Sequence, residues 1–339
     1  MKKIFLNLIL FGLLAFIGCL KDAPVVQANS EENNSADILI YLESQGDYIN
    51  SQQMPSLITA TEVYNNPSDK IILDIRSSGD FATGHIQNAI NISPAEIINY
   101  LDTSDPNKTV VIVSLTGQSA SYYTSLLRFY GYTNAFTLKY GMTAWNNDFA
   151  SKWINHMQHK GLFNNKVNNK PAFSPLPELT FSNSGDNIKE KVNSRIQELM
   201  SIDFSESDES EISISVQNLN TIYSTLTEEY ANTFIVCYAQ NQGEYILGSS
   251  LDNPGHLPSA VYYQDNSFEA SDLRSSANLQ TIPSNKDIVV YSRIGHSSAF
   301  ITAYLRVLGY NARSLLFGMK WLFGFDQSQV KNYPYITGS

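Results

Sequence analysis

The sequence predicts an α/β protein in which one domain occurs twice, each copy a small parallel sheet with helices on both faces. Short β-branched runs, such as Thr109 to Ser114, alternate with stretches of helical periodicity, such as Ser119 to Tyr130. Buried parallel strands have this composition, and their alternation with helices is typical of βαβ units. The order recurs later, where Thr233 to Tyr238 and Asp287 to Ser292 precede a helical stretch at Ser297 to Leu308.

Matching motifs in the two halves support this repeat. The stretch 126–132 reads Leu-Leu-Arg-Phe-Tyr-Gly-Tyr, and the stretch 304–310 reads Tyr-Leu-Arg-Val-Leu-Gly-Tyr. Each is followed by a Gly-Met pair and a tryptophan, and each is preceded at the same distance by a loop glycine, Gly117 or Gly295. Matched motifs in matched order at matched spacing are the signature of an internal duplication.

The first nineteen residues predict export and lipid anchoring. A short positive start precedes an apolar run at 4–17, which is too short for a membrane span of roughly 18 or more residues. The run ends at Cys19 and resembles the lipobox of bacterial lipoproteins, with Phe16 where that motif usually has leucine. We therefore expect a signal peptide at 1–18 and an acylated Cys19 held in membrane lipid at the bacterial cell envelope, facing the periplasm or the surface. A plain signal peptide without a role for Cys19 is the alternative.

Changes in composition divide the rest of the chain, because polar, aperiodic stretches are typical of tethers and linkers. The expected divisions are a lipidated tether with a short helix at 19–55, the first domain at 56–150, a linker with a helix at 151–208, the second domain at 209–326 and a tail at 327–339.

Three segments outside the two domains carry predictions of their own. Residues 36–44 predict a short helix with Ser35 as its N-cap. Between 187 and 200, apolar residues recur at every fourth position, which predicts a helix that packs across the domain junction. Residues 205–211 read Ser-Glu-Ser-Asp-Glu-Ser-Glu, and we expect a solvated loop there rather than an acidic binding site.

Charge and cysteine content exclude several classes of function. The net charge of −10 disfavours a nucleic-acid partner, because phosphate binding needs a basic face. The only cysteines are Cys19 and Cys237, so acylation of the first leaves neither an intramolecular disulfide nor a multi-cysteine metal site. His85 and His256 each follow a glycine without a second ligand at metal spacing. We therefore expect no metal and no other cofactor, and structural hydrogen bonds for both histidines.

Residues 72–92 resemble the signature of the rhodanese family. Ile-Leu-Asp-Ile-Arg is an Asp-x-Arg strand end, and Asp-Phe-Ala-Thr-Gly-His-Ile follows after a short gap as an acidic–aromatic pair and a Gly-His-Ile turn. The resemblance covers about 56–150 and, more weakly, about 209–326, where Asp-x-Arg is missing. It implies a rhodanese-like fold for each copy and sulfurtransferases as relatives. We expect Asp74 and Arg76 to hold the turn by charge-assisted hydrogen bonds.

The resemblance also assigns the catalytic positions of the two copies. In the rhodanese family, a cysteine after a strand accepts sulfane sulfur as a persulfide, and an arginine ends the loop that follows. The matching cysteine positions hold Ser114 and Ser292, and the arginine positions hold Ser119 and Ser297. A serine hydroxyl ionises far less readily than a thiol and cannot form a persulfide. We therefore interpret Ser114 and Ser292 as degenerate catalytic positions.

The two loops still have a sequence that suits an anion. A tight turn that opens a helix presents backbone N–H groups and the positive end of the helix dipole, worth about 0.3–1 kcal/mol towards an anion. A small oxyanion is therefore a candidate ligand, and loops that only maintain the fold are the alternative. The candidate residues are Leu115, Thr116, Gly117, Gln118 and Ser119 in the first copy, and Arg293, Ile294, Gly295, His296 and Ser297 in the second.

The leading hypothesis is a membrane-anchored, non-catalytic binding or interaction module. Its candidate partners are membrane lipid, a small anion or sulfur-containing ligand, and an envelope protein. The alternatives are a thiosulfate or persulfide sulfurtransferase or sulfur carrier that uses Cys237, and a hydrolase that uses Ser292 with His296. We expect Cys237 to be a buried small side chain, because its strand neighbours are apolar. We expect His296 to be an exposed loop residue.

Overall fold

The computed structural model describes residues 34–51, 53–151, 166–181, 187–225, 228–246, 248–250, 253–267, 269–318 and 327–338. The expected signal peptide, Cys19 and most of the tether lie outside these residues, as does Trp321. Every helix in the described part of the chain is too short or too polar to cross a membrane.

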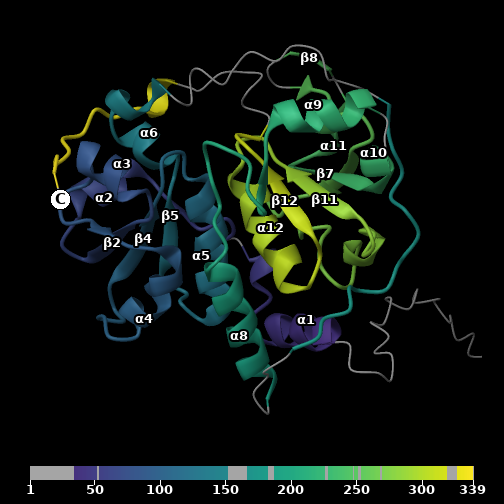
Figure 1. Ribbon diagram of the computed structural model, residues 1–339, viewed down its shortest axis with the longest axis horizontal. Coiled ribbons are helices and arrows are strands. Elements are labelled where there is room, and N and C mark those ends of the chain that lie inside the picture. The colour runs from purple at the N-terminus through teal and green to yellow at the C-terminus, as the bar shows by residue number, and fades with distance from the viewer. Residues whose placement is uncertain are drawn as a thin grey trace, which may run out of the picture.

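Two five-stranded parallel sheets form the framework, as the sequence predicts (Figure 1). The first contains β1 (Leu57–Ile58), β2 (Lys70–Asp74), β3 (Ile90–Asn91), β4 (Thr109–Val113) and β5 (Ala135–Leu138), in the order β1-β5-β4-β2-β3. The second contains β6 (Ser213–Ile214), β7 (Thr233–Ala239), β10 (Val261–Gln264), β11 (Asp287–Tyr291) and β12 (Ala312–Leu315). Its order from the other end is β6-β12-β11-β7-β10, so each strand has a counterpart at the same place in the first sheet.

A short antiparallel pair, β8 (Gly248–Ser250) and β9 (Asn253–Pro254), lies apart from the two main sheets. The α-helices are α1 (Asn34–Ser44), α2 (Ala60–Asn65), α3 (Ser78–Thr83), α4 (Ile97–Leu101), α5 (Gln118–Tyr130), α6 (Gly141–Trp145), α8 (Ile188–Met200), α9 (Val216–Thr225), α10 (Glu228–Asn232), α11 (Gln242–Ile246) and α12 (His296–Val307). The 3-10 turns are Tyr48–Asn50, Pro94–Glu96, Asn147–Phe149, Leu279–Thr281 and Gln327–Gln329.

The alternation of side chains along β4 shows how each sheet is buried on both faces. Val110 and Ile112 belong to a cluster that extends into the second half of the molecule. Val111 and Val113 point to the other face and belong to a smaller cluster beneath α2 and α6. Because successive side chains of a strand point to opposite faces, a run of apolar residues buries both faces at once.

Helices α5 and α12 pack against each other between the two sheets (Figure 1). Phe129 of α5 lies 5.9 Å from Phe300 and 6.1 Å from Tyr304 of α12, measured between ring centroids. Helix α8 contacts α5, α12 and α1, and its buried side chains are Val192, Ile196, Leu199 and Met200. The predicted junction helix is confirmed. The interpretation of Ser35 as an N-cap is wrong, because Ser35 lies within α1 and donates to the Pro177 carbonyl oxygen at 2.5 Å.

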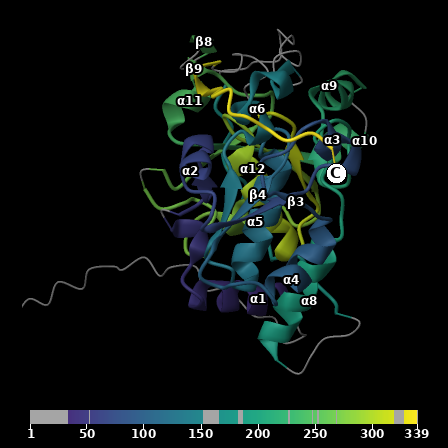
Figure 2. The same ribbon diagram turned by 90° about the vertical axis from the view of Figure 1, so that its left-hand side faces the viewer.

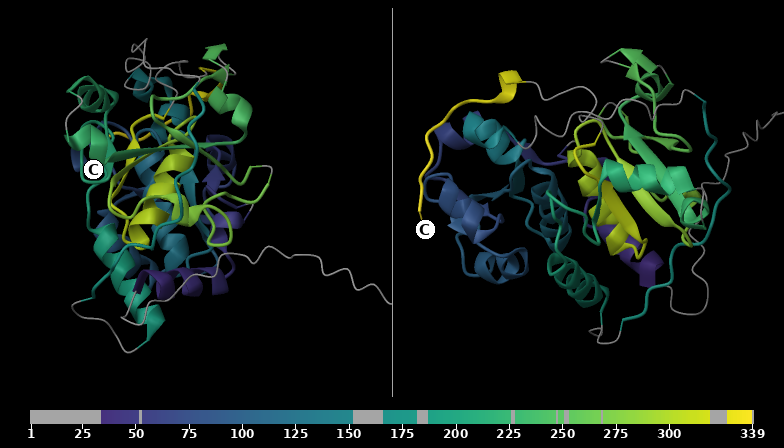
Figure 3. Two further views of the ribbon diagram at one scale, coloured as in Figure 1. Left: turned by 90° about the vertical axis from the view of Figure 1, so that its right-hand side faces the viewer. Right: turned by 45° about the horizontal axis from the view of Figure 1, so that its top comes forward.

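The C-terminal segment, residues 327–338, follows the second sheet in the chain but packs beside α2 and α6 of the first half (Figures 2 and 3). Ile336 exchanges two backbone hydrogen bonds with His85, at 2.9 and 2.8 Å. The Tyr333 ring stacks on Tyr64 at 4.1 Å, and Trp145 Nε1 donates to the Pro334 carbonyl oxygen at 2.9 Å. The predicted tail is thus a structural part of the first half.

Candidate functional site

The two loops predicted to carry chemistry meet in the middle of the molecule. Ser114 directly follows β4 and Ser292 directly follows β11, and each loop leads through a glycine into α5 or α12. Gly117 and Gly295 adopt left-handed φ angles of 85° and 84°. A Cβ at Gly117 would lie 2.6 Å from His296 Nε2, and a Cβ at Gly295 would lie 2.9 Å from Gln118 Cδ. Only glycine fits both the φ angle and the close approach.

The residue after each glycine reaches into the opposite half. Gln118 Nε2 donates to the Leu315 carbonyl oxygen at 2.8 Å, and its Oε1 accepts from the Phe317 N–H at 2.8 Å. His296 Nε2 accepts from the Tyr140 N–H at 3.1 Å. Tyr140 and Phe317 occupy matching places, each before the glycine of a Gly-Met pair. The exchange is therefore reciprocal, and it places Gln118 and His296 at the interface between the two halves.

His296 is fully buried, so the expectation of an exposed loop histidine is wrong. Because its Nε2 accepts a hydrogen bond, its Nδ1 carries the proton of the neutral ring and donates to the Ile294 carbonyl oxygen at 3.2 Å. Burial lowers the pKa of His296 to about 3. Ser292 Oγ accepts from the Ser298 N–H at 3.0 Å. Both ring nitrogens of His296 have backbone partners, so the ring is not available to activate Ser292.

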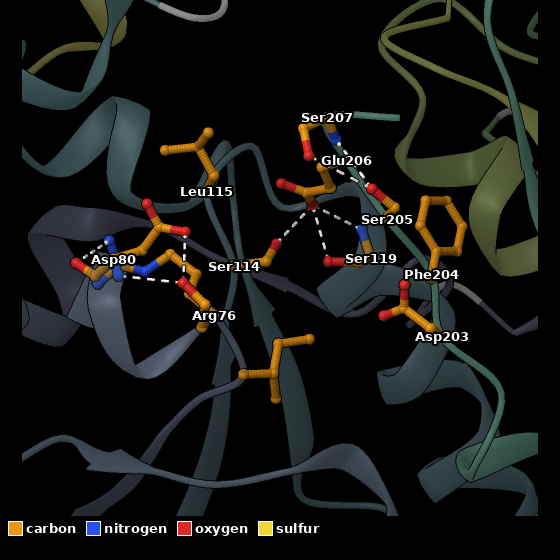
Figure 4. A pocket seen from close by; sticks show the side chains of 12 residues that line it. Arg76, Asp80, Ser114, Leu115, Ser119, Asp203, Phe204, Ser205, Glu206 and Ser207 are labelled. Carbon is orange, nitrogen blue, oxygen red and sulfur yellow. Dashed lines mark hydrogen bonds between the residues drawn. The ribbon is translucent and has the colours of Figure 1, made fainter. Parts of the chain in front are cut away.

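The first loop holds a carboxylate that sequence analysis did not place there (Figure 4). Oε1 of Glu206 accepts from the Ser114 hydroxyl at 2.7 Å, the Ser119 N–H at 2.7 Å and the Ser119 hydroxyl at 2.9 Å. Oε2 accepts from the Thr116 N–H at 2.8 Å. The expectation of a solvated loop at 205–211 is therefore wrong for Glu206. We call Ser114, Thr116 and Ser119 the carboxylate cradle.

The hydroxyl of Ser114 donates one hydrogen bond and accepts two within the protein. Its proton is directed to Glu206, and its oxygen accepts from the N–H groups of Gly117 at 3.0 Å and Ala120 at 3.3 Å. A hydroxyl has one proton and two lone pairs. Each is used within the protein, so Ser114 has no lone pair directed at an incoming electrophile.

Helix α5 also positions the segment that carries Glu206. Tyr123, one turn after Ser119, donates to the Ile202 carbonyl oxygen at 2.7 Å and accepts from the Phe204 N–H at 3.0 Å. Phe204 is buried and lies 5.7 Å from the Tyr122 ring. Burial also raises the pKa of Tyr123, so the phenol keeps its proton for this contact. Helix α5 thus supplies Ser119 of the cradle and anchors the chain just before Glu206.

A cavity of about 220 Å³ opens beside the cradle (Figure 4). It is lined by Ile75, Arg76, Ser77, Asp80, Ser114, Leu115, Ser119, Asp203, Phe204, Ser205, Glu206 and Ser207. Arg76 makes a bidentate contact with Asp74, at 2.9 and 2.6 Å, and donates to the Gly84 carbonyl oxygen at 2.8 Å. The predicted role of Asp74 and Arg76 in holding the turn is confirmed. Their pairing also neutralises the Arg76 guanidinium, which lines this cavity.

The remaining predicted residues do not line this cavity. In the second loop, Ile294 and Ser297 are half-buried and Arg293 is exposed. Cys237 is buried in the core of the second sheet, next in register to Tyr262 and Tyr291.

The two glycine-flanked histidines have the expected structural role. His85 Nδ1 lies 3.0 Å from the Phe81 carbonyl oxygen. The two nitrogens of His256 lie 2.6 Å and 2.9 Å from the carbonyl oxygens of Tyr245 and Lys166. Within the described ranges, no cluster of three or more histidine, cysteine or acidic residues could hold a metal.

Sequence comparison identifies one domain of this chain. Residues 59–148 match the model of the rhodanese-like domain, so the chain contains such a domain. The chain is 31% identical over 84 residues to the uncharacterized protein YibN of Escherichia coli K12, which covers 24% of this chain and 58% of YibN. It therefore spans less than two thirds of YibN. It is 27% identical over 84 residues to the thiosulfate sulfurtransferase GlpE of Pseudoalteromonas translucida, covering 25% of this chain and 80% of GlpE.

Two solved structures illustrate the similarity of fold. SseA from Escherichia coli, a 3-mercaptopyruvate sulfotransferase, is 12% identical and matches with a TM-score of 0.27 over 76% of this chain and 97% of SseA. Tum1 from Saccharomyces cerevisiae is 13% identical and matches with a TM-score of 0.30 over 82% of this chain and 99% of Tum1.

Proposed function

We propose that this protein, which contains a rhodanese-like domain, is an anion-binding module that does not transfer sulfur. The observation that carries the proposal is the state of Ser114. It takes the place at which the rhodanese resemblance expects the sulfur-accepting cysteine, and its hydroxyl is held by Glu206 and two backbone N–H groups. The Ser114 hydroxyl donates a hydrogen bond to an anionic group, and a serine has no thiolate on which a persulfide could form.

The proposal includes a second, degenerate rhodanese-like domain over about 209–326. The second sheet has the same strand order as the first, and Ser292 follows β11 as Ser114 follows β4. The hydrogen bonds that Gln118 and His296 each make to the opposite half would let each loop support the other, which suits a scaffold better than two independent catalytic centres.

The two enzymatic alternatives find less support in the geometry. Cys237 is only 4% exposed, whereas a sulfur carrier must present its thiolate to donor and acceptor. A hydrolase would need His296 as the base for Ser292, and both nitrogens of that ring are bound to backbone groups.

A thiosulfate:cyanide assay tests the loss of sulfur transfer. The full chain, purified in detergent, is given thiosulfate and cyanide, and thiocyanate is measured against a GlpE-type sulfurtransferase as the positive control. We expect no thiocyanate above the protein-free background from the wild type or from Cys237→Ser. Formation by the wild type would overturn the proposal, and loss of that activity in Cys237→Ser would identify the sulfur carrier.

We also propose that Cys19 is acylated and anchors the protein at the cell envelope. Growth of expressing bacteria with an alkyne-tagged fatty acid should label the wild type and Cys237→Ser equally, and Cys19→Ser should lose the label. Equal labelling of Cys19→Ser would contradict the anchor.

A further inference from the structure

Glu206 occupies the carboxylate cradle as a ligand would. Its four hydrogen bonds come from residues 87 to 92 positions away in the sequence. The connecting segment between α8 and β6 delivers it, and no element of the first sheet needs this carboxylate for its own pairing. We propose that the cradle is a carboxylate-binding site that the chain fills with its own Glu206, and that an external carboxylate binds there in exchange. This inference rests on the proposed anion-binding role of the first loop.

The donors of the cradle match the shape of a carboxylate. Three donors converge on one oxygen of Glu206 and a fourth reaches the other, so both oxygens of a planar group are bound. Two of the donors are backbone N–H groups, one of them in the first turn of the 13-residue helix α5. Such groups, together with the helix dipole, favour negative charge.

The charge of the surroundings favours a monoanion. Every hydrogen-bond partner of the Glu206 carboxylate in the described chain is a neutral hydroxyl or amide. Ser119 stands where the rhodanese resemblance expects an arginine, and Arg76 is already paired with Asp74. A dianion such as sulfate or thiosulfate would therefore lack a counter-charge, whereas a single carboxylate is satisfied as Glu206 is.

The geometry allows Glu206 to leave without unfolding its surroundings. The Tyr123 contacts hold Ile202 and Phe204, which precede Glu206, and these stay in place when the side chain swings out. The next three residues, Ser207 to Glu209, are exposed. The neighbouring cavity of about 220 Å³ gives a small carboxylate a route to the same donors.

Chemical rescue tests the exchange. Glu206→Ala empties the cradle in the full chain, and its unfolding temperature is followed in detergent with increasing formate against potassium chloride of equal ionic strength. We expect formate to raise the unfolding temperature saturably in Glu206→Ala, with at least a tenfold higher apparent affinity than in the wild type. Asp208→Ala, on the same segment, is the matched control and should respond as the wild type does. In the double variant Glu206→Ala/Ser119→Ala, the apparent affinity for formate should fall about fivefold, because one hydroxyl donor is lost.

Glu206→Asp carries the test if Glu206→Ala does not fold. It keeps the charge but shortens the side chain by one methylene, so formate should shift the backbone amide resonances of Thr116 and Ser119 at lower concentrations than in the wild type. A folded Glu206 variant with no response beyond that to chloride would overturn the carboxylate site, as would equal rescue by sulfate or thiosulfate. Thiocyanate formation by the wild type would overturn the proposed loss of sulfur transfer and leave this titration unaffected.

Discussion

Ser114 and His296 are polar loop residues whose roles follow from what surrounds them. Ser114 has its proton and both lone pairs engaged, and His296 has both ring nitrogens engaged. Buried polar groups are stable only when they are hydrogen-bonded, since an unmet donor or acceptor costs about 1–3 kcal/mol. Each side chain is therefore fixed in one orientation and one protonation state.

The buried His296 makes stability depend on pH. In the unfolded chain its imidazole is protonated as the pH falls through about 6.5, whereas in the folded protein burial keeps the pKa at about 3. The unfolded state therefore binds more protons between these values, and stability is lost as the pH falls, by up to about 1.4 kcal/mol per pH unit.

His296→Gln should remove this dependence. Glutamine is the residue of the matching position, where Gln118 Oε1 accepts a backbone N–H as His296 Nε2 does. Urea unfolding from pH 7 to 4.5 should show a smaller loss of unfolding free energy in the variant than in the wild type. Parallel curves for the two proteins would contradict the assignment of the proton to His296.

At the scale of elements, the close crossing of α5 and α12 depends on the glycine before each helix. Gly117 and Gly295 bring the loops so near that each glycine faces the side chain of the opposite loop. Helix ends packed in this way require a residue without a side chain, because cores tolerate added volume poorly.

Gly117→Ala should therefore destabilise the protein by about 1–3 kcal/mol from overpacking, in addition to the strain of a left-handed φ. Gly131→Ala is the matched control, because Gly131 also has a positive φ, of 127°, but has no atom within 4 Å of an added Cβ. Chemical denaturation should give a lower free energy of unfolding for Gly117→Ala than for Gly131→Ala. Equal losses would mean that backbone strain alone decides the cost.

At the scale of the whole molecule, the α5–α12 contact, helix α8 and the C-terminal segment are among the described features that join the two halves. The C-terminal segment, residues 327–338, lies beside the first half (Figure 3). Its Tyr333 ring contacts the rings of Tyr64 and Trp145. Residues from the C-terminal end of the chain thus contribute to the hydrophobic core of the first half.

Deletion of residues 332–338 should destabilise the first half by about 2–4 kcal/mol, from the lost aromatic contacts and hydrogen bonds. Hydrogen exchange should report faster exchange of the His85 amide, which donates to the Ile336 carbonyl oxygen. Gln327→Ala, at the exposed start of the segment, should leave that amide protected. An unchanged His85 amide after the deletion would show that the segment contributes no stability there.

Local pattern in the sequence predicts much of this molecule. Apolar runs predict β4 and β11, helical periodicity predicts α5 and α8, and the apolar neighbours of Cys237 predict its burial. These features depend on residues close in the chain, whose periodicity carries the needed information. Glu206 and His296 are the two site residues that sequence analysis misread.

The sequence alone determined the two parallel sheets and the repeated order of strands and helices in the two halves. It also determined that serines stand where the rhodanese resemblance expects catalytic cysteines. Only the tertiary structure decided that Glu206 fills the first loop and that Gln118 and His296 lock the halves together. The physical reason is that periodicity records which face of an element is buried, but not which distant group covers a loop. That depends on the path of the connecting segments and on how two whole sheets pack.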